Sequence, residues 1–133
     1  MSKDLHPSIL DFFRDRMAGH SNVADLRDES DQENYIFRIT RSKQRDEILV
    51  WLTDAYLFTD ADYYARPPSL RPGDFILVAK PEGGFHLDRD TIDRERIGVG
   101  QIGKFMGALN SRSMWTYLTR DEREQLEREK RRI

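Results

Sequence analysis

The stretch that decides the fold is Asp74-Phe75-Ile76-Leu77-Val78-Ala79, an acidic residue followed by five apolar ones. A short run that is apolar at every position is typical of a strand that is buried on both faces of a sheet. Further along, glycines recur from Gly98 onwards, and the apolar spacing predicts a helix over residues 99–109. A buried strand followed by a helix predicts an α/β domain with this pair at its centre.

The residues that precede this strand predict a helix and a hairpin. Residues 7–18 are expected to form an amphipathic helix, because a proline begins the segment and a glycine follows it. Residues 21–34 are polar and acidic and predict a loop. Residues 35–40 alternate in polarity and residues 46–53 are apolar on both faces, which predicts a hairpin whose second strand is central.

Between residues 54 and 73 the chain is rich in aromatic residues and proline. This composition predicts a short helical turn and then an extended surface path. The aromatic residues are expected to cover the edge of the sheet, and lining a groove is the alternative. After the strand, a glycine-containing turn predicts a returning strand over residues 85–88. The charged residues 89–96 are expected to be exposed.

A final strand is predicted over residues 114–118, followed by a charged helix that reaches nearly to the end of the chain. The predicted order is therefore α-β-β-β-β-α-β-α, in one α/β (α+β) domain over residues 1–133 with a single mixed sheet of about five strands. Residues 119–133 begin with a capping box and are a possible extension of the domain.

The composition limits the kinds of function. The chain has 133 residues, 35% of them charged, and a formal net charge of −2, which does not favour nucleic-acid binding but leaves it possible. The absence of cysteine excludes disulfides, thiol nucleophiles and cysteine-based zinc sites. Neither a signal peptide nor a membrane-spanning run is recognisable, so we expect an intracellular, cytoplasmic protein without a membrane partner.

The first candidate site is Gly98-Val99-Gly100-Gln101-Ile102-Gly103, which has the spacing GxGxxG. In dinucleotide-binding proteins, such glycines let the backbone approach a pyrophosphate at the start of a helix. Here the preceding residues 93–97 are charged and do not form a buried strand. Close packing is therefore the favoured role of Gly98, Gly100 and Gly103, and anion or nucleotide binding is the alternative.

The second candidate site consists of aspartates that follow strands. Asp74 begins the buried strand, and Asp88 and Asp90 lie on or after the next one. The element order over residues 46–118 resembles the PD-(D/E)xK nuclease fold, whose core order is α-β-β-β-α-β. The resemblance implies that Asp74 and Asp88 bind Mg²⁺ or another divalent cation, which activates water. This interpretation requires the two carboxylates to lie within reach of one cation.

The resemblance also assigns roles to residues around these ligands. Gln101 lies on the helix that contributes a glutamine in the family. Asp90 stands where the family has its lysine and would be auxiliary, so Lys80 or Lys104 would have to supply the positive charge. Without the lysine of the motif, an inactive relative of the fold fits the sequence as well as an active one.

The third candidate site is basic. It comprises a turn with Arg38, Arg41, Lys43 and Arg45, and a separate basic end near residue 130. Either could contact phosphates. Because acidic residues directly follow the turn, a solvated surface is the favoured interpretation.

Three functions remain open at this point. The leading hypothesis is a noncatalytic or decayed module of nuclease-like architecture that is associated with nucleic acid or with an assembly, and a homo-oligomer is one form that such an assembly takes. The alternatives are an active metal-dependent nuclease and an anion or nucleotide binder at residues 98–103.

Overall fold

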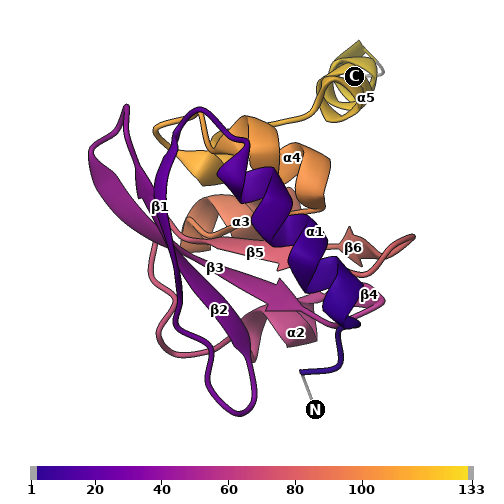
Figure 1. The fold of residues 1–133 in the computed structure, drawn as a ribbon. Helices are drawn as coiled ribbons and strands as arrows, with labels where there is room; N and C mark the ends of the chain where they lie inside the picture. Colours follow the sequence, from indigo (N-terminus) through magenta and orange to yellow (C-terminus); the bar gives the residue numbers. More distant parts are fainter. Residues whose placement is uncertain (1–2, 132–133) are drawn as a thin grey trace.

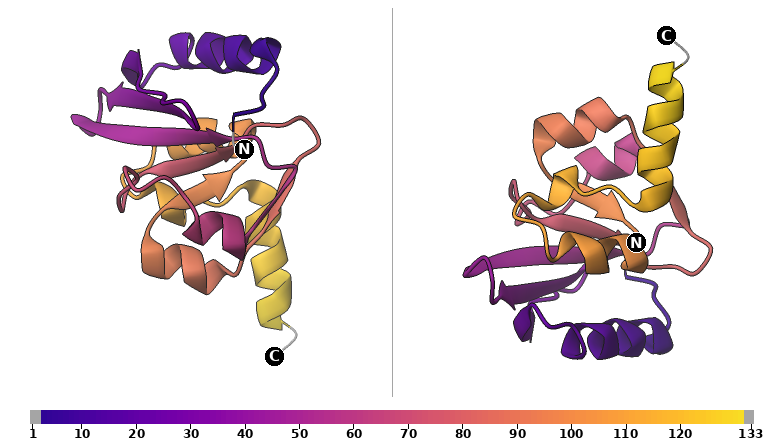
Figure 2. Two further views of the ribbon diagram at one scale, coloured as in Figure 1. Left: turned by 90° about the horizontal axis from the view of Figure 1, so that it is seen from below. Right: turned by 90° about the horizontal axis from the view of Figure 1, so that it is seen from above.

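A five-stranded mixed sheet separates two layers of helices in the computed structural model, which describes residues 3–131 (Figures 1 and 2). The first three strands pair antiparallel, and the third, fourth and fifth pair parallel. In spatial order the strands are β1 (Val23–Asp28), β2 (Tyr35–Arg41), β3 (Asp46–Thr53), β5 (Phe75–Val78) and β7 (Gly98–Gly100). The predicted α/β class and mixed five-stranded sheet are confirmed.

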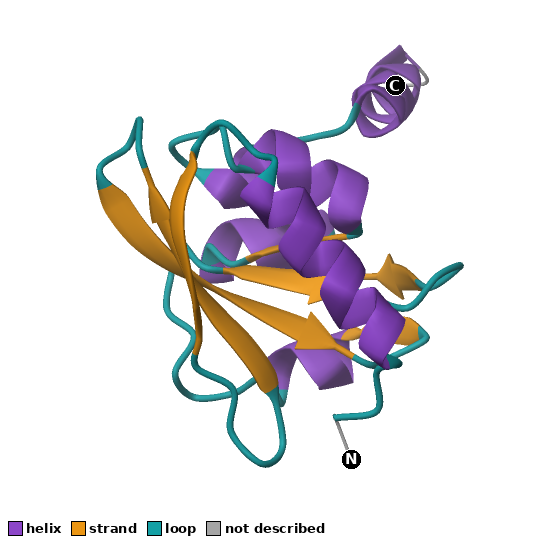
Figure 3. Cartoon of the chain, in the orientation of Figure 1, coloured by secondary structure: helices purple, strands orange, loops and turns teal. Residues whose placement is uncertain are grey.

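Each face of the sheet has its own hydrophobic core. Along β2 the side chains alternate, so Phe37 and Ile39 pack toward one helical layer and Ile36 packs toward the other. The helices of the first layer are α1 (Pro7–Ala18) and α4 (Ile102–Ala108), and those of the second are α2 (Asp60–Tyr64) and α3 (Arg89–Glu95). Figure 3 shows the same layering by type of element.

Two short strands, β4 (Leu57–Thr59) and β6 (Gly84–His86), form a separate parallel pair. The strand predicted to return after β5 therefore exists, but it pairs with β4 and not with the main sheet. From the segment 54–73, Phe58 and Tyr63 are fully buried in the second core, so these two aromatic residues pack against the sheet.

Three local predictions were wrong. Residues 21–34 were expected to be a loop, but β1 occupies residues 23–28 as the edge strand beside β2. Residues 114–118 were expected to be a strand, but Met114–Thr116 is a single 3-10 turn, η1. The fifth strand is instead β7, so the helix predicted to start at residue 99 begins only at Ile102.

The charged segment 89–96 also differs from expectation, because it folds as α3. The Asp88 side chain caps its first turn, and Thr91 and Ile92 are buried against the body of the protein. A helix needs few apolar residues when only one narrow face is covered. The charged side chains of the segment are exposed or half-buried.

The last helix, α5 (Arg120–Arg131), has no buried residue and projects away from the body (Figure 2). A capping box between Thr119 and Glu122 begins the helix, and an ion pair of 3.0 Å between Lys104 Nζ and Glu122 joins it to α4. Within residues 3–131, no helix has the length and apolar character that a bilayer crossing requires.

Candidate functional site

Asp74 is a buried carboxylate at the start of β5, and both of its oxygens accept hydrogen bonds from the backbone. Oδ1 accepts from the N–H of Leu49 at 2.9 Å and Oδ2 accepts from the N–H of Arg71 at 2.8 Å. Burial raises the pKa of Asp74, although these two N–H groups and the nearby Arg38 act in the opposite direction. The carboxylate thus joins β3 to the loop that leads into β5.

Asp88 and Asp90 lie at the other end of α3 from Asp74. Asp88 is the N-terminal cap of the helix, while the N–H of Gly73 donates to the carbonyl of Arg96 directly after the helix ends. A helix of seven residues is about 10 Å long. One cation holds its oxygen ligands at about 2.3–2.6 Å, so Asp74 and Asp88 do not share a cation in this fold.

The metal site implied by the nuclease resemblance is therefore not assembled by these aspartates. Within residues 3–131, no group of three or more histidine or acidic side chains could hold a metal ion. Lys104 is also remote from this role, because its ammonium is buried beside the ring of Phe85 and bound to Glu122. Burial lowers the pKa of Lys104, and the Glu122 carboxylate opposes that change.

The buried position of Asp74 gives a pH prediction for the variant Asp74→Asn. Because the pKa of Asp74 is raised by burial, the folded chain holds this proton more tightly than the unfolded chain. The contribution of Asp74 to stability is therefore largest in acid and falls as pH rises through the folded pKa. The free energy of unfolding of the wild type, minus that of the variant, should fall from acidic to neutral pH.

Urea unfolding of both proteins at a series of pH values measures this difference. The subtraction cancels the other carboxylates that the two proteins share. A difference that rises with pH would mean that Asp74 is stabilised as the anion, as expected for a carboxylate beside a dominant cation.

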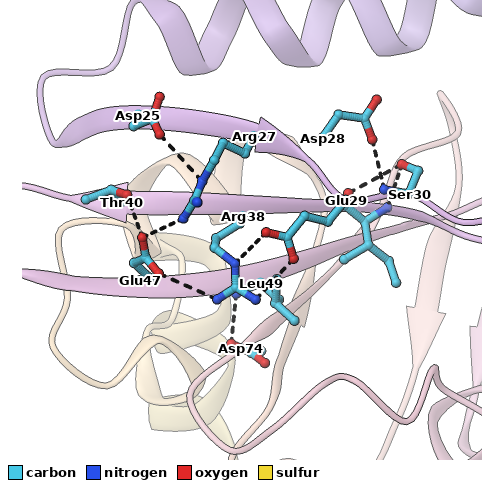
Figure 4. Close-up of polar contacts among 11 residues, drawn as sticks. Asp25, Arg27, Asp28, Glu29, Ser30, Arg38, Thr40, Glu47, Leu49 and Asp74 are labelled. Carbon is cyan, nitrogen blue, oxygen red and sulfur yellow. Dashed lines mark hydrogen bonds and ion pairs between the residues drawn. The ribbon is translucent and has the colours of Figure 1, made fainter.

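Two of the cations in the basic turn, Arg38 and Arg41, are already paired with carboxylates. Arg38 lies on β2, where Glu29 accepts from its Nε at 2.6 Å and Glu47 lies 3.7 Å from its Nη1 (Figure 4). Arg27 binds the same Glu47 at 2.7 Å and extends the network to Asp25. A hydrogen bond from Arg38 lowers the pKa of Glu29.

Arg41 was expected in the same solvated turn, but it is buried, with 1% of its surface exposed. Its guanidinium binds Asp46 with two nitrogens, at 2.9 and 2.7 Å, and donates to the carbonyl of Ser111 at 2.6 Å. It also donates to the carbonyl of Leu109 at 3.3 Å, which Asn22 contacts at 2.7 Å. Arg41 is thus a structural residue and does not contact phosphates.

The glycines of the GxGxxG sequence have different surroundings. A Cβ on Gly98 would lie 2.6 Å from the Phe75 ring, and one on Gly100 would meet the side chain of Lys104. These two glycines permit close packing, as favoured from the sequence. Gly103 does not, because a Cβ there would have no heavy atom within 4 Å.

Three predicted site residues do come together, in a cleft beside the carboxyl end of β5. Lys80, Gln101 and Gly103 line it, and its volume is about 520 Å³. We call it the carboxyl-edge cleft. Its other lining residues come from α1, from the end of β5 and the turn after it, and from the first residue of α4: Ser8, Ile9, Phe12, Phe13, Leu77, Val78, Ala79, Pro81 and Ile102.

The carboxyl-edge cleft is mostly apolar, and its polar groups are at the rim. Phe12 is 46% exposed although it is aromatic. The Lys80 side chain is 31% exposed, and its ammonium lies 3.9 Å from Asp4, a carboxylate that is itself 87% exposed. The Gln101 amide donates to the carbonyl of Gly83 and fixes the loop after Lys80. Sequence reasoning missed the contribution of α1 to this site.

These features define a three-layer α/β domain with an apolar cleft at the carboxyl ends of its parallel strands. No family model matches the chain, and no curated protein or solved structure is significantly similar to it.

Proposed function

We propose that the chain is a noncatalytic binding module whose ligand site is the carboxyl-edge cleft. The observation that supports this most directly is the volume of the cleft, about 520 Å³, which is within the range of small-molecule sites. Its location fits as well, since ligands of open α/β sheets bind outside the carboxyl ends of the strands.

The chemistry of the lining favours an amphipathic anion. Ile9, Phe12 and Ile102 offer apolar surface to the body of a ligand. Lys80 is the cation at the rim, and its long ion pair with an exposed partner costs little to replace. A compound with an aromatic or aliphatic body and one acidic group satisfies both parts of the cleft.

An active metal-dependent nuclease has less support. Both oxygens of Asp74 accept from backbone donors, and Asp88 lies at the far end of α3, so the two carboxylates that the mechanism needs at one cation are held apart. A noncatalytic relative of the PD-(D/E)xK fold stays a proposal.

Titration with 8-anilinonaphthalene-1-sulfonate, an apolar aromatic anion, tests the proposed site. We expect saturable binding to the folded protein. Gly103→Leu should weaken it by about tenfold or more, because the new side chain extends from a position with free space into the cleft. Lys80→Gln should weaken binding less and reduce its dependence on salt.

The control is Leu126→Ala on α5, which lines a different hollow, about 380 Å³, between α5 and the body. It should leave the binding of the probe unchanged. If Leu126→Ala weakens binding and Gly103→Leu does not, the probe occupies the hollow beside α5 and the proposal is wrong. Near-ultraviolet circular dichroism of each variant verifies that the probe reports on a folded protein.

A further inference from the structure

Helix α5 is the only α-helix among residues 3–131 without a buried side chain, and it stands clear of the body in Figures 1 and 2. Its contacts are confined to its first half, where Glu122 binds Lys104 and Arg120 binds Glu124. From residue 125 to residue 131, no side chain makes a hydrogen bond or ion pair with the described part of the chain. Because an isolated helix of twelve residues is marginal in water, the second half of α5 lacks a packing partner.

The one apolar side chain of α5 is Leu126, which is 40% exposed. It also lines the hollow of about 380 Å³ between α5 and the body. The other apolar residues of this hollow are Phe85, Leu87, Ile92 and Leu118. Since Leu126 both lines the hollow and stays exposed, it lies at the rim, where a partner can cover it and bury apolar surface.

The charged residues of α5 are arranged symmetrically about Leu126, with opposite signs on its two sides. At each distance from two to five positions, the residue before Leu126 and the residue after it carry opposite charges. The pairs are Glu124 with Arg128, Arg123 with Glu129, Glu122 with Lys130, and Asp121 with Arg131. A sequence with this symmetry is complementary to a second copy of itself that runs in the opposite direction.

Helical geometry selects which of these pairs face each other. Residues three and four positions from Leu126 lie on the same face as its side chain. In an antiparallel pair of helices that cross at Leu126, Arg123 therefore meets Glu129, and Glu122 meets Lys130. Arg123, Glu129 and Lys130 are all exposed and have no ion pair within residues 3–131. A parallel pair would instead place each charge against its own copy, which is repulsive.

We propose that the partner of α5 is a second copy of the chain. The two α5 helices pack antiparallel about a two-fold axis at Leu126, and each Arg123 pairs with Glu129 of the second copy. Such an interface uses the same patch of both subunits, as in most symmetric dimers. It is separate from the carboxyl-edge cleft and does not depend on the function proposed for it. Because two helices of twelve residues bury little surface, the dimer is weak and forms only at high protein concentration.

Sedimentation equilibrium of the full chain at low salt tests this proposal. Between about 10 μM and about 1 mM protein, the mass should rise from 15.7 kDa toward twice that value. Arg123→Glu and Glu129→Arg should each weaken dimerisation by about tenfold or more, because each variant turns both symmetry-related pairs into like charges. The control is Glu127→Arg, an exposed residue whose counterpart across Leu126 is the neutral Gln125, and it should leave dimerisation unchanged.

Two further measurements separate pairing from damage to the helix. An equimolar mixture of Arg123→Glu and Glu129→Arg should dimerise, because every facing pair in the mixed dimer has opposite charges. The double variant should recover dimerisation for the same reason. A monomer at every concentration of the wild type would overturn the proposal. So would a mixture that stays monomeric, since the loss in each single variant would then come from the helix itself. Dimerisation that neither single variant weakens would also overturn it, because the interface would lie elsewhere.

Discussion

Arg41→Met should lower the free energy of unfolding by about 3 kcal/mol or more. The substitution removes the charge and all five donors but keeps an unbranched apolar side chain of similar length. It leaves the carbonyl of Ser111 without the 2.6 Å hydrogen bond from Arg41, while the carbonyl of Leu109 loses the Arg41 bond and keeps the one from Asn22. An acceptor that is left unsatisfied in a buried position costs about 1–3 kcal/mol.

Urea unfolding followed by circular dichroism measures the loss, and Lys43→Met is the matched control. Lys43 is an exposed cation in the same turn, so its removal should change stability by less than about 0.5 kcal/mol. High salt should reduce the effect of Arg41→Met only in part, because Arg41 is buried while the side chain of its partner Asp46 is 41% exposed. Equal losses in the two variants would contradict the structural role of Arg41.

Arg41 also illustrates what sequence reasoning could not reach. Its partners beyond Asp46 are backbone carbonyls of the segment 109–112, and a carbonyl carries no sequence signature. The carboxyl-edge cleft could not be predicted from the sequence for a related reason. It forms only where α1 meets the start of α4, and residues that are distant in the chain give no local pattern for such a meeting.

The elements that were predicted correctly have the strongest patterns. The run from Phe75 to Ala79 has no polar side chain, and the alternation in residues 35–40 matches the period of a strand. Strand β7 was missed because Gly-Val-Gly offers a single apolar side chain. The usable signal was Ile97 followed by Val99, two buried residues at a spacing of two on the face toward the second core. The charged residues before Ile97 concealed it.

Gly98→Ala should destabilise the protein by about 2 kcal/mol, which is the usual range for overpacking a filled core. The added Cβ would lie 2.6 Å from Cδ2 of Phe75 and 3.3 Å from the Cα of Trp115. Phe75 is fully buried and packed on Phe105, with ring centroids 4.9 Å apart, so its ring has little room to move. The contact with Trp115 involves backbone and cannot be relieved by a side-chain rotation.

The matched control is the same substitution in the same GxGxxG sequence, Gly103→Ala. Gly103 lies within α4, and a Cβ there meets no heavy atom within 4 Å, so the gain in helix propensity should stabilise the protein by about 0.5–1 kcal/mol. Tight packing at Gly98 and helix propensity at Gly103 therefore predict opposite signs at two glycines of one motif. If the glycines instead served a nucleotide site, both variants would keep the stability of the ligand-free protein and lose stabilisation by added dinucleotide. Unfolding curves of the two variants, with and without a dinucleotide, distinguish these origins of the motif.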